Sequence, residues 1–118
     1  MTTAKLSDDL RNMLPLTPAV FFILFALAEG EKHGYAIMQD VNELSSGEVR
    51  MGPGTLYTTI QRLLDLALIE ETSGEDSERK RRYYRLTRTG KSLLEAEVAR
   101  MDKVVRMARQ QRLVPDAK

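Results

Sequence analysis

Small polar side chains recur every three residues in the stretch that follows Pro53. If this stretch is helical, Thr55, Thr58 and Gln61 share its outward face. Hydroxyl and amide groups donate and accept hydrogen bonds, and a glutamine amide can make two bonds to the edge of adenine. A helix with this face fits the major groove of double-stranded DNA. The residues of this stretch predicted to meet bases or phosphates are Pro53, Thr55, Tyr57, Thr58, Gln61 and Arg62.

Cationic side chains are concentrated further along the chain. The net charge is only +1, yet residues 75–91 carry seven Lys or Arg against three acids. Arg79, Lys80 and Arg81 cluster where a polar turn leads into a strand, and there they could bind the DNA backbone. A run of this kind can also be a solvated strand with scattered salt bridges. The neighbouring polar helix favours DNA as the partner.

Catalysis has little support in the sequence, so we expect no enzyme activity, catalytic residue, cofactor or metal. The one histidine, His33, lies at a predicted loop–helix junction without a second histidine or any cysteine. It is therefore read as a capping or packing residue. The Gly52-Pro53-Gly54 tripeptide lacks the Lys-Ser/Thr pair of a phosphate-binding loop and is read as a tight turn.

The composition is that of an ordinary globular protein, with 42% hydrophobic and 30% charged residues among 118. The absence of cysteine fits a reducing compartment, and we expect a cytoplasmic protein. The apolar run 16–28 is shorter than the roughly 20 residues that span a bilayer. Asp8 and Asp9 spoil a signal-peptide leader. The run is therefore predicted to be a buried helix.

The periodicities predict an α+β, mainly α fold: a winged helix-turn-helix with a long C-terminal dimerisation helix. A short N-terminal arm or helix occupies residues 1–15, the winged helix 16–87, the last helix 88–114 and a tail 115–118. Thr17 and Pro18 are typical of a helix start. The predicted elements are helices from Ser7, over 18–28, over 34–44 and from Pro53 with Ala67 on its buried stripe, and a two-stranded hairpin over 68–72 and 81–87.

The last helix has an apolar seam with alternating spacings of four and three residues. Its members are Leu94, Val98, Met101, Val105 and Ala108. A helix of this length on a small domain needs a surface to bury the seam, so we expect a homodimer and a palindromic operator. A small apolar or aromatic effector would fit between the terminal helices and the first core helix, against Phe21, Phe25, Met101 and Met107.

Three blocks together resemble the PadR family of bacterial transcriptional regulators. They are 33–37 (HGYAI), 54–57 (GTLY) with the Leu68-Ile69 pair, and 82–87 (RYYRLT) with Gly90. The resemblance implies a homodimeric winged-helix repressor of the short subfamily, released by a small molecule, with Tyr35 near the DNA backbone. Ala67 stands where the family usually has glycine, which argues against a left-handed turn there. The chain has no Trp, so the aromatic drug sandwich of some relatives does not carry over.

A winged-helix module for protein–protein interaction is the alternative, with the basic strand meeting an acidic partner. Such an interface favours exposed aromatic or aliphatic residues on the third helix. The small polar residues of that helix favour DNA.

Overall fold

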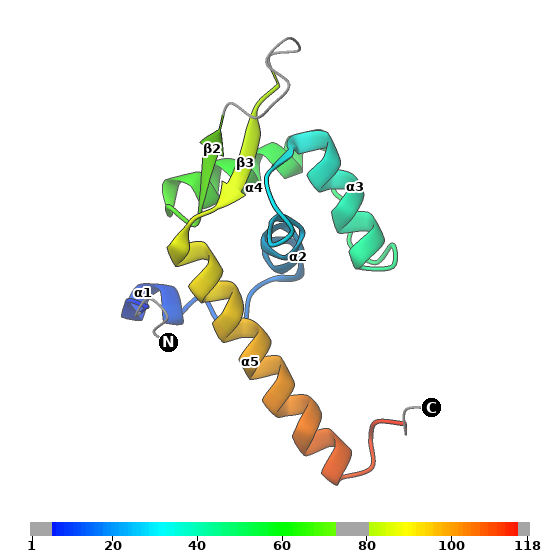
Figure 1. The fold of residues 1–118 in the computed structure, drawn as a ribbon. Helices are drawn as coiled ribbons and strands as arrows, with labels where there is room; N and C mark the ends of the chain where they lie inside the picture. The colour runs from blue at the N-terminus through cyan, green and yellow to red at the C-terminus, as the bar shows by residue number, and fades with distance from the viewer. Residues whose placement is uncertain (1–5, 73–80, 116–118) are drawn as a thin grey trace.

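The computed structural model describes residues 6–72 and 81–115. It is mainly helical with one small antiparallel sheet, a winged helix-turn-helix with a long C-terminal helix (Figure 1). The helices are α1 (Asp8–Arg11), α2 (Pro18–Leu27), α3 (Gly34–Leu44), α4 (Pro53–Asp65) and α5 (Arg88–Gln110). The strands are β1 (Lys32–His33), β2 (Ile69–Thr72) and β3 (Tyr83–Leu86).

Capping side chains set where the predicted helices begin. The Thr17 hydroxyl accepts a hydrogen bond from the Val20 amide at 3.3 Å, with proline at the first position of α2. The Thr87 hydroxyl does the same for the Gly90 amide at 3.0 Å at the start of α5. The predicted starts of these helices are therefore confirmed.

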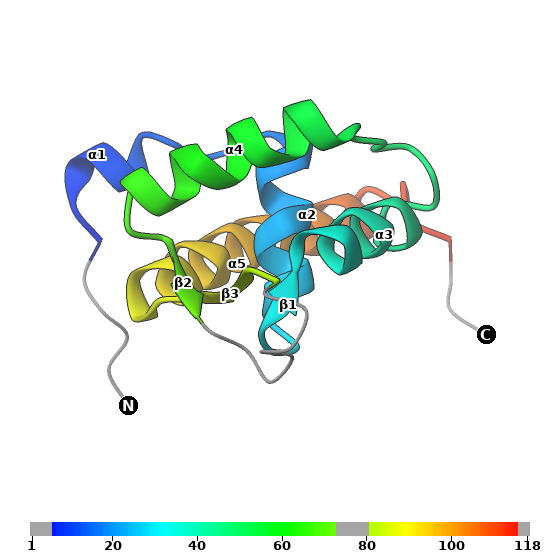
Figure 2. The same cartoon turned by 90° about the horizontal axis from the view of Figure 1, so that it is seen from above.

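The helix α2 lies at the centre of the molecule, with α4 on one side and α5 on the other (Figure 2). Its residues Ile23, Leu24 and Ala26 are fully buried, since the helix is apolar on nearly every side. The predicted central core helix is confirmed. None of the helices in the ranges 6–72 and 81–115 is both long and apolar enough to cross a bilayer.

The sheet has three strands in the order β1-β3-β2, where the sequence predicted a two-stranded hairpin. The missed strand β1 has only two residues and pairs Lys32 with Tyr84 and His33 with Tyr83. A two-residue strand has no alternation to detect. The extra pairing ties the start of α3 directly to the wing, which we define as residues 69–86.

Ala67 was predicted to continue the buried stripe of α4 and to argue against a left-handed turn, and both predictions are wrong. It is exposed, lies past the end of α4 and has a φ of 57°. The Ala67 amide bonds to the Leu64 carbonyl at 2.9 Å, and the Leu68 amide bonds to the Leu63 carbonyl at 3.0 Å. This is the Schellman pattern, which closes the helix and turns Leu68 into the core.

Replacing Ala67 by glycine should raise the free energy of unfolding by up to about 1 kcal/mol. The left-handed conformation costs alanine roughly 1–2 kcal/mol, and glycine removes this cost. Glycine also makes the unfolded chain more flexible, which lowers the stability by about 0.4–1 kcal/mol and offsets part of the gain. Urea unfolding at fixed protein concentration measures the change. The matched control is Ala99→Gly on the exposed surface of α5, which should be destabilised by about 1 kcal/mol. A loss of similar size in Ala67→Gly would contradict the expectation.

Glu97 joins the N-terminal segment to α5 through a fully buried carboxylate. One carboxylate oxygen accepts from the Leu16 amide at 2.8 Å, and the other accepts from the Arg100 guanidinium at 2.6 Å. The hydrogen bond from Arg100 is the largest influence and lowers the pKa of Glu97, although burial opposes it. The buried carboxylate is therefore held in its ionised form, and both of its oxygens accept hydrogen bonds.

The C-terminal half of α5 projects away from the sheet and from α2 (Figure 1). Val98, Val105 and Met107 are 40–46% exposed along it. Leu94 of the predicted seam instead lies in the core of its own chain, at 6% exposure. The apolar stripe that faces solvent therefore begins at Val98.

Candidate nucleic-acid interface

The helix α4 presents a polar face to solvent and an apolar face to the core. Leu56, Ile60 and Leu63 are buried to within 2% exposure. The opposite face exposes residues of the predicted reading surface: Pro53, Thr55, Tyr57, Thr58, Gln61 and Arg62. The helical phase deduced from the sequence is thus the one observed.

Hydrogen bonds within α4 leave some of its polar side chains more available to bind a ligand than others. The Thr59 hydroxyl donates to the Thr55 carbonyl at 2.9 Å, so it is turned back onto the helix. The Gln61 side-chain amide donates to the Asp65 carboxylate at 3.0 Å. This bond leaves the carbonyl oxygen and the second amide proton of Gln61 for a ligand. Asp65, which the sequence did not single out, lines a shallow hollow of about 490 Å³ beside Tyr57, Thr58, Gln61 and Arg62.

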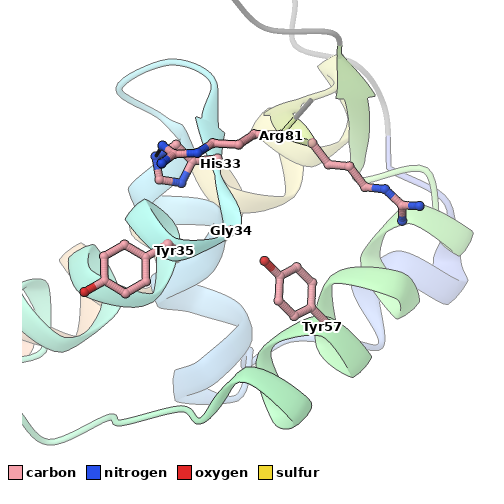
Figure 3. A pocket seen from close by; sticks show the side chains of 6 residues that line it. His33, Gly34, Tyr35, Tyr57 and Arg81 are labelled. Atoms are coloured by element: carbon pink, nitrogen blue, oxygen red, sulfur yellow. Dashed lines mark hydrogen bonds between the residues drawn. The ribbon is translucent and has the colours of Figure 1, made fainter. Parts of the chain in front are cut away.

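A second hollow, of about 430 Å³, lies between the start of α3, the first half of α4 and the wing (Figure 3). Its lining residues are His33, Gly34, Tyr35, Tyr57, Arg81 and Arg82. The Tyr57 ring rises from α4 toward Gly34, whereas the Tyr35 ring points away from it. We call this site the tyrosine hollow. Two arginines and the Tyr57 hydroxyl make it suited to an anion.

His33 connects the wing to α3 at the rim of this hollow. Its Nδ1 atom accepts from the Ala36 amide at 3.2 Å, and its Nε2 atom lies 3.0 Å from a terminal guanidinium nitrogen of Arg81. A neutral imidazole has only one nitrogen that can accept a hydrogen bond. The Ala36 amide and the Arg81 guanidinium therefore cannot both donate to a neutral His33 at the same time. The Tyr83 ring packs edge-on against His33 at 5.5 Å. The sequence predicted a capping or packing role for His33, and the structure shows both, but its placement beside Arg81 depends on the undetected strand β1.

Acidic residues of β2 pair with part of the cationic strip. The Arg85 guanidinium lies 2.7 Å from the Glu70 carboxylate, and that of Arg82 lies 4.0 Å from Glu71. Burial raises the pKa of the Tyr84 hydroxyl beneath them, and the charge of Glu71 raises it further. Arg85 is therefore matched within the sheet. Arg79 and Lys80 of the predicted phosphate-binding cluster lie outside the described residues.

The predicted effector residues lie on α2 and α5. The rings of Phe21 and Phe25 stack at 5.3 Å, and Phe25 is 40% exposed. On α5, Met101 is half-buried and Met107 is exposed. Within the ranges 6–72 and 81–115, no three His, Asp or Glu side chains come close enough to hold a metal ion.

Comparisons with known proteins agree with the geometry of the fold. Residues 23–96 match the family described as the transcriptional regulator PadR-like family. The chain is 38% identical over 85 residues to the transcriptional regulator Rv3488 of Mycobacterium tuberculosis, covering 71% of this chain and 76% of that regulator.

Solved structures show the same fold. A PadR family transcription regulator from Clostridium difficile R20291 superposes with a TM-score of 0.67 at 28% identity, over 80% of this chain and 97% of that one. Bacillus subtilis PadR, solved in complex with operator DNA, superposes with a TM-score of 0.61 at 24% identity. That match covers 71% of this chain but only 47% of the longer PadR chain. The family model and the identity to Rv3488 show that this chain belongs to the PadR-like family of transcriptional regulators.

Proposed function

We propose that this protein is a homodimeric repressor that binds double-stranded DNA in a sequence-specific way and is released by a small molecule. The observation that carries the proposal is the exposed polar face of α4 beside the arginine-lined tyrosine hollow. The operator complex of Bacillus subtilis PadR supports it by analogy of fold. The residues proposed to contact DNA are Tyr35, Pro53, Thr55, Tyr57, Thr58, Gln61, Arg62, Arg79, Lys80 and Arg81.

In this proposal Thr58 and Gln61 read base edges, and the arginines and tyrosines hold phosphates. A duplex selected from a random pool should contain an inverted repeat with half-sites about one helical turn apart. Replacing Gln61 by alanine should weaken binding to that duplex about 10–100-fold, since a well-placed amide discriminates by about 1–3 kcal/mol. Binding to unrelated DNA should hardly change. Fluorescence anisotropy on both duplexes measures the two affinities.

The matched control for Gln61→Ala is Gln110→Ala, at the far end of α5, which should leave both affinities unchanged. Equal losses on both duplexes in Gln61→Ala would show that α4 does not read sequence. A parent protein without affinity for any duplex would favour the protein-interaction alternative.

The homodimer is proposed from the exposed stripe of α5. Val98, Val105 and Met107 are exposed apolar side chains on the part of α5 that projects away from the domain. Light scattering at micromolar concentration should give twice the 13.4 kDa mass of one chain. The double variant Val98→Asp/Val105→Asp should shift the mass toward that of a single chain, whereas Lys103→Asp, an exposed polar position of the same helix, should not. A single-chain mass for the parent would end this part of the proposal.

The effector is proposed to be a small apolar or aromatic molecule that binds between α2 and the partner's α5. The stacked and partly exposed Phe21–Phe25 pair and the flexible Met101 and Met107 side chains support this chemistry. Adding flat aromatic compounds to the protein–DNA complex tests it. An active compound should release the DNA, and the variant Phe25→Ala should respond less to the same compound.

A further inference from the structure

Tyr57 and Gly34 fit together across the gap between α4 and α3. Gly34 is the first residue of α3 and is buried. A Cβ atom at this position would overlap the Tyr57 hydroxyl and would lie 2.7 Å from the ring carbon that bears it. These atoms come from a side chain and not from a main chain, so the glycine makes room for the end of the Tyr57 ring (Figure 3).

The contact fixes the polar end of a side chain that is otherwise 47% exposed. Tyr57 belongs to the first half of α4, yet its hydroxyl rests against the first turn of α3. A tyrosine has only two rotatable side-chain bonds, so a packing contact at its tip restricts the positions that the ring can take. The hydroxyl therefore occupies a defined place in the tyrosine hollow.

We propose that Gly34 is a positioning residue for DNA binding, because its missing side chain seats Tyr57 as a fixed hydrogen-bond donor to a backbone phosphate. This inference rests on the proposed function of the protein. Gly34 itself would not contact the DNA. Its part is to hold the phenol hydroxyl at the phosphate before the duplex arrives, so that little side-chain freedom is lost on binding.

The surroundings of the hydroxyl favour an anion as its ligand. Arg81 and Arg82 line the same hollow. The helix α3 begins there, so the positive end of its dipole faces the hollow as well. The exposed face of α4 begins beside it, and a duplex in contact with that face would bring a phosphate to this point.

A purely structural role for Gly34 predicts a different result from a positioning role. If the glycine served only to let α3 and α4 pack, adding a methyl group would disturb both helices whether or not Tyr57 carried a hydroxyl. If it serves to seat the hydroxyl, the methyl group should cost affinity only while that hydroxyl is present. A double-mutant cycle separates the two roles.

The cycle consists of the parent, Gly34→Ala, Tyr57→Phe and the double variant, each titrated with one selected duplex at one salt concentration. Each single variant should lower the affinity about tenfold, the scale of one hydrogen bond to a charged group. The double variant should lose no more than about tenfold in total, because both changes remove the same contact. Thermal unfolding should stay within a few degrees of the parent throughout.

The control cycle pairs Gly34→Ala with Tyr35→Phe, whose ring lines the same hollow but points away from Tyr57. In that pair the two losses should multiply. Labelling the four tyrosines with fluorine gives a readout without DNA, since only the resonance of Tyr57 should shift markedly in Gly34→Ala.

Losses that multiply in the Gly34–Tyr57 cycle would overturn the inference, and so would parental affinity in Gly34→Ala. Should Gly34→Ala fail to fold, parental affinity in Tyr57→Phe would overturn it equally. If the parent binds a duplex and only the cycle fails, the proposed function stands without this inference. A parent that binds no duplex would overturn both.

Discussion

Replacing Gly90 by alanine should lower the free energy of unfolding by about 3 kcal/mol or more. Helix propensity alone predicts the opposite sign, because alanine is favoured over glycine inside a helix by about 1 kcal/mol. The surroundings of Gly90 reverse that preference. A Cβ atom there would overlap the carbonyl oxygen of Leu68 and lie 2.8 Å from the carbonyl carbon.

The obstacle is main chain, and hydrogen bonds hold it in place. The Leu68 carbonyl accepts from the Thr87 amide at 3.1 Å, and the Thr87 hydroxyl donates to the Ala67 carbonyl at 2.7 Å. The first turn of α5 therefore cannot move away from the α4–β2 junction without breaking its own anchoring bonds. Overpacking against such a neighbour costs more than the usual 1–3 kcal/mol.

Urea or thermal unfolding at fixed protein concentration measures this change. Gly54→Ala is the matched control, since Gly54 lies in the first turn of α4 and an added Cβ meets nothing within 4 Å. It should gain roughly 0.5–1 kcal/mol. A Gly90→Ala variant that unfolds at or above the temperature of the parent would show that the junction can open without cost.

The triple variant Arg79→Ala, Lys80→Ala, Arg81→Ala should bind every duplex about 100-fold more weakly, or worse, at roughly 0.1 M salt. These residues lie in the cationic strip, and Arg81 lines the tyrosine hollow. A contact with phosphate carries no sequence information, so selected and unrelated DNA should lose affinity alike. The dependence of log affinity on log salt should also become shallower, by about 0.9 for each phosphate that the variant no longer neutralises.

A control must separate local binding of phosphate from overall charge. The triple variant Lys103→Ala, Arg109→Ala, Arg112→Ala removes the same charge from exposed positions on and just beyond the far half of α5. It should keep the salt slope of the parent and most of its affinity, because those sites are remote from the wing (Figure 1). If the two triple variants behave alike, the wing has no local role and only net charge matters.

The sequence predicted those parts of the fold that local signals specify. Thr17 with Pro18 indicated the start of α2, and the outward face of α4 followed from its apolar period. Strand β1 escaped because it exists only through pairing with β3, a distant segment. Ala67 was misplaced because the helical period continued past the true end of α4.

The sequence predicted which residue types form the candidate site, but not how the fold brings them together. Thr58 and Gln61 were placed on the correct face. The bond from Gln61 to Asp65 lies within one turn of α4, so it is a local contact that the sequence analysis overlooked. The close approach of Tyr57 to Gly34 joins two helices and depends on the tertiary fold. Leu94 is a second residue whose environment its spacing in the sequence did not reveal. It fits the seam by spacing, yet it is buried in its own chain because the body of the domain still covers α5 at that point.

The carboxylate of Glu97 decides how the segment that leads into α2 responds to acid. Its pKa is lowered in the folded chain by Arg100 and the Leu16 amide, so its contribution to stability is complete above the unfolded value near 4.5. That contribution disappears as the pH falls through the lower, folded pKa. The leading segment is thus tethered by an ionised group as well as by apolar contact. Protonation of Glu97 would weaken its hydrogen bonds to the Leu16 amide and to Arg100, whereas at neutral pH both bonds are kept.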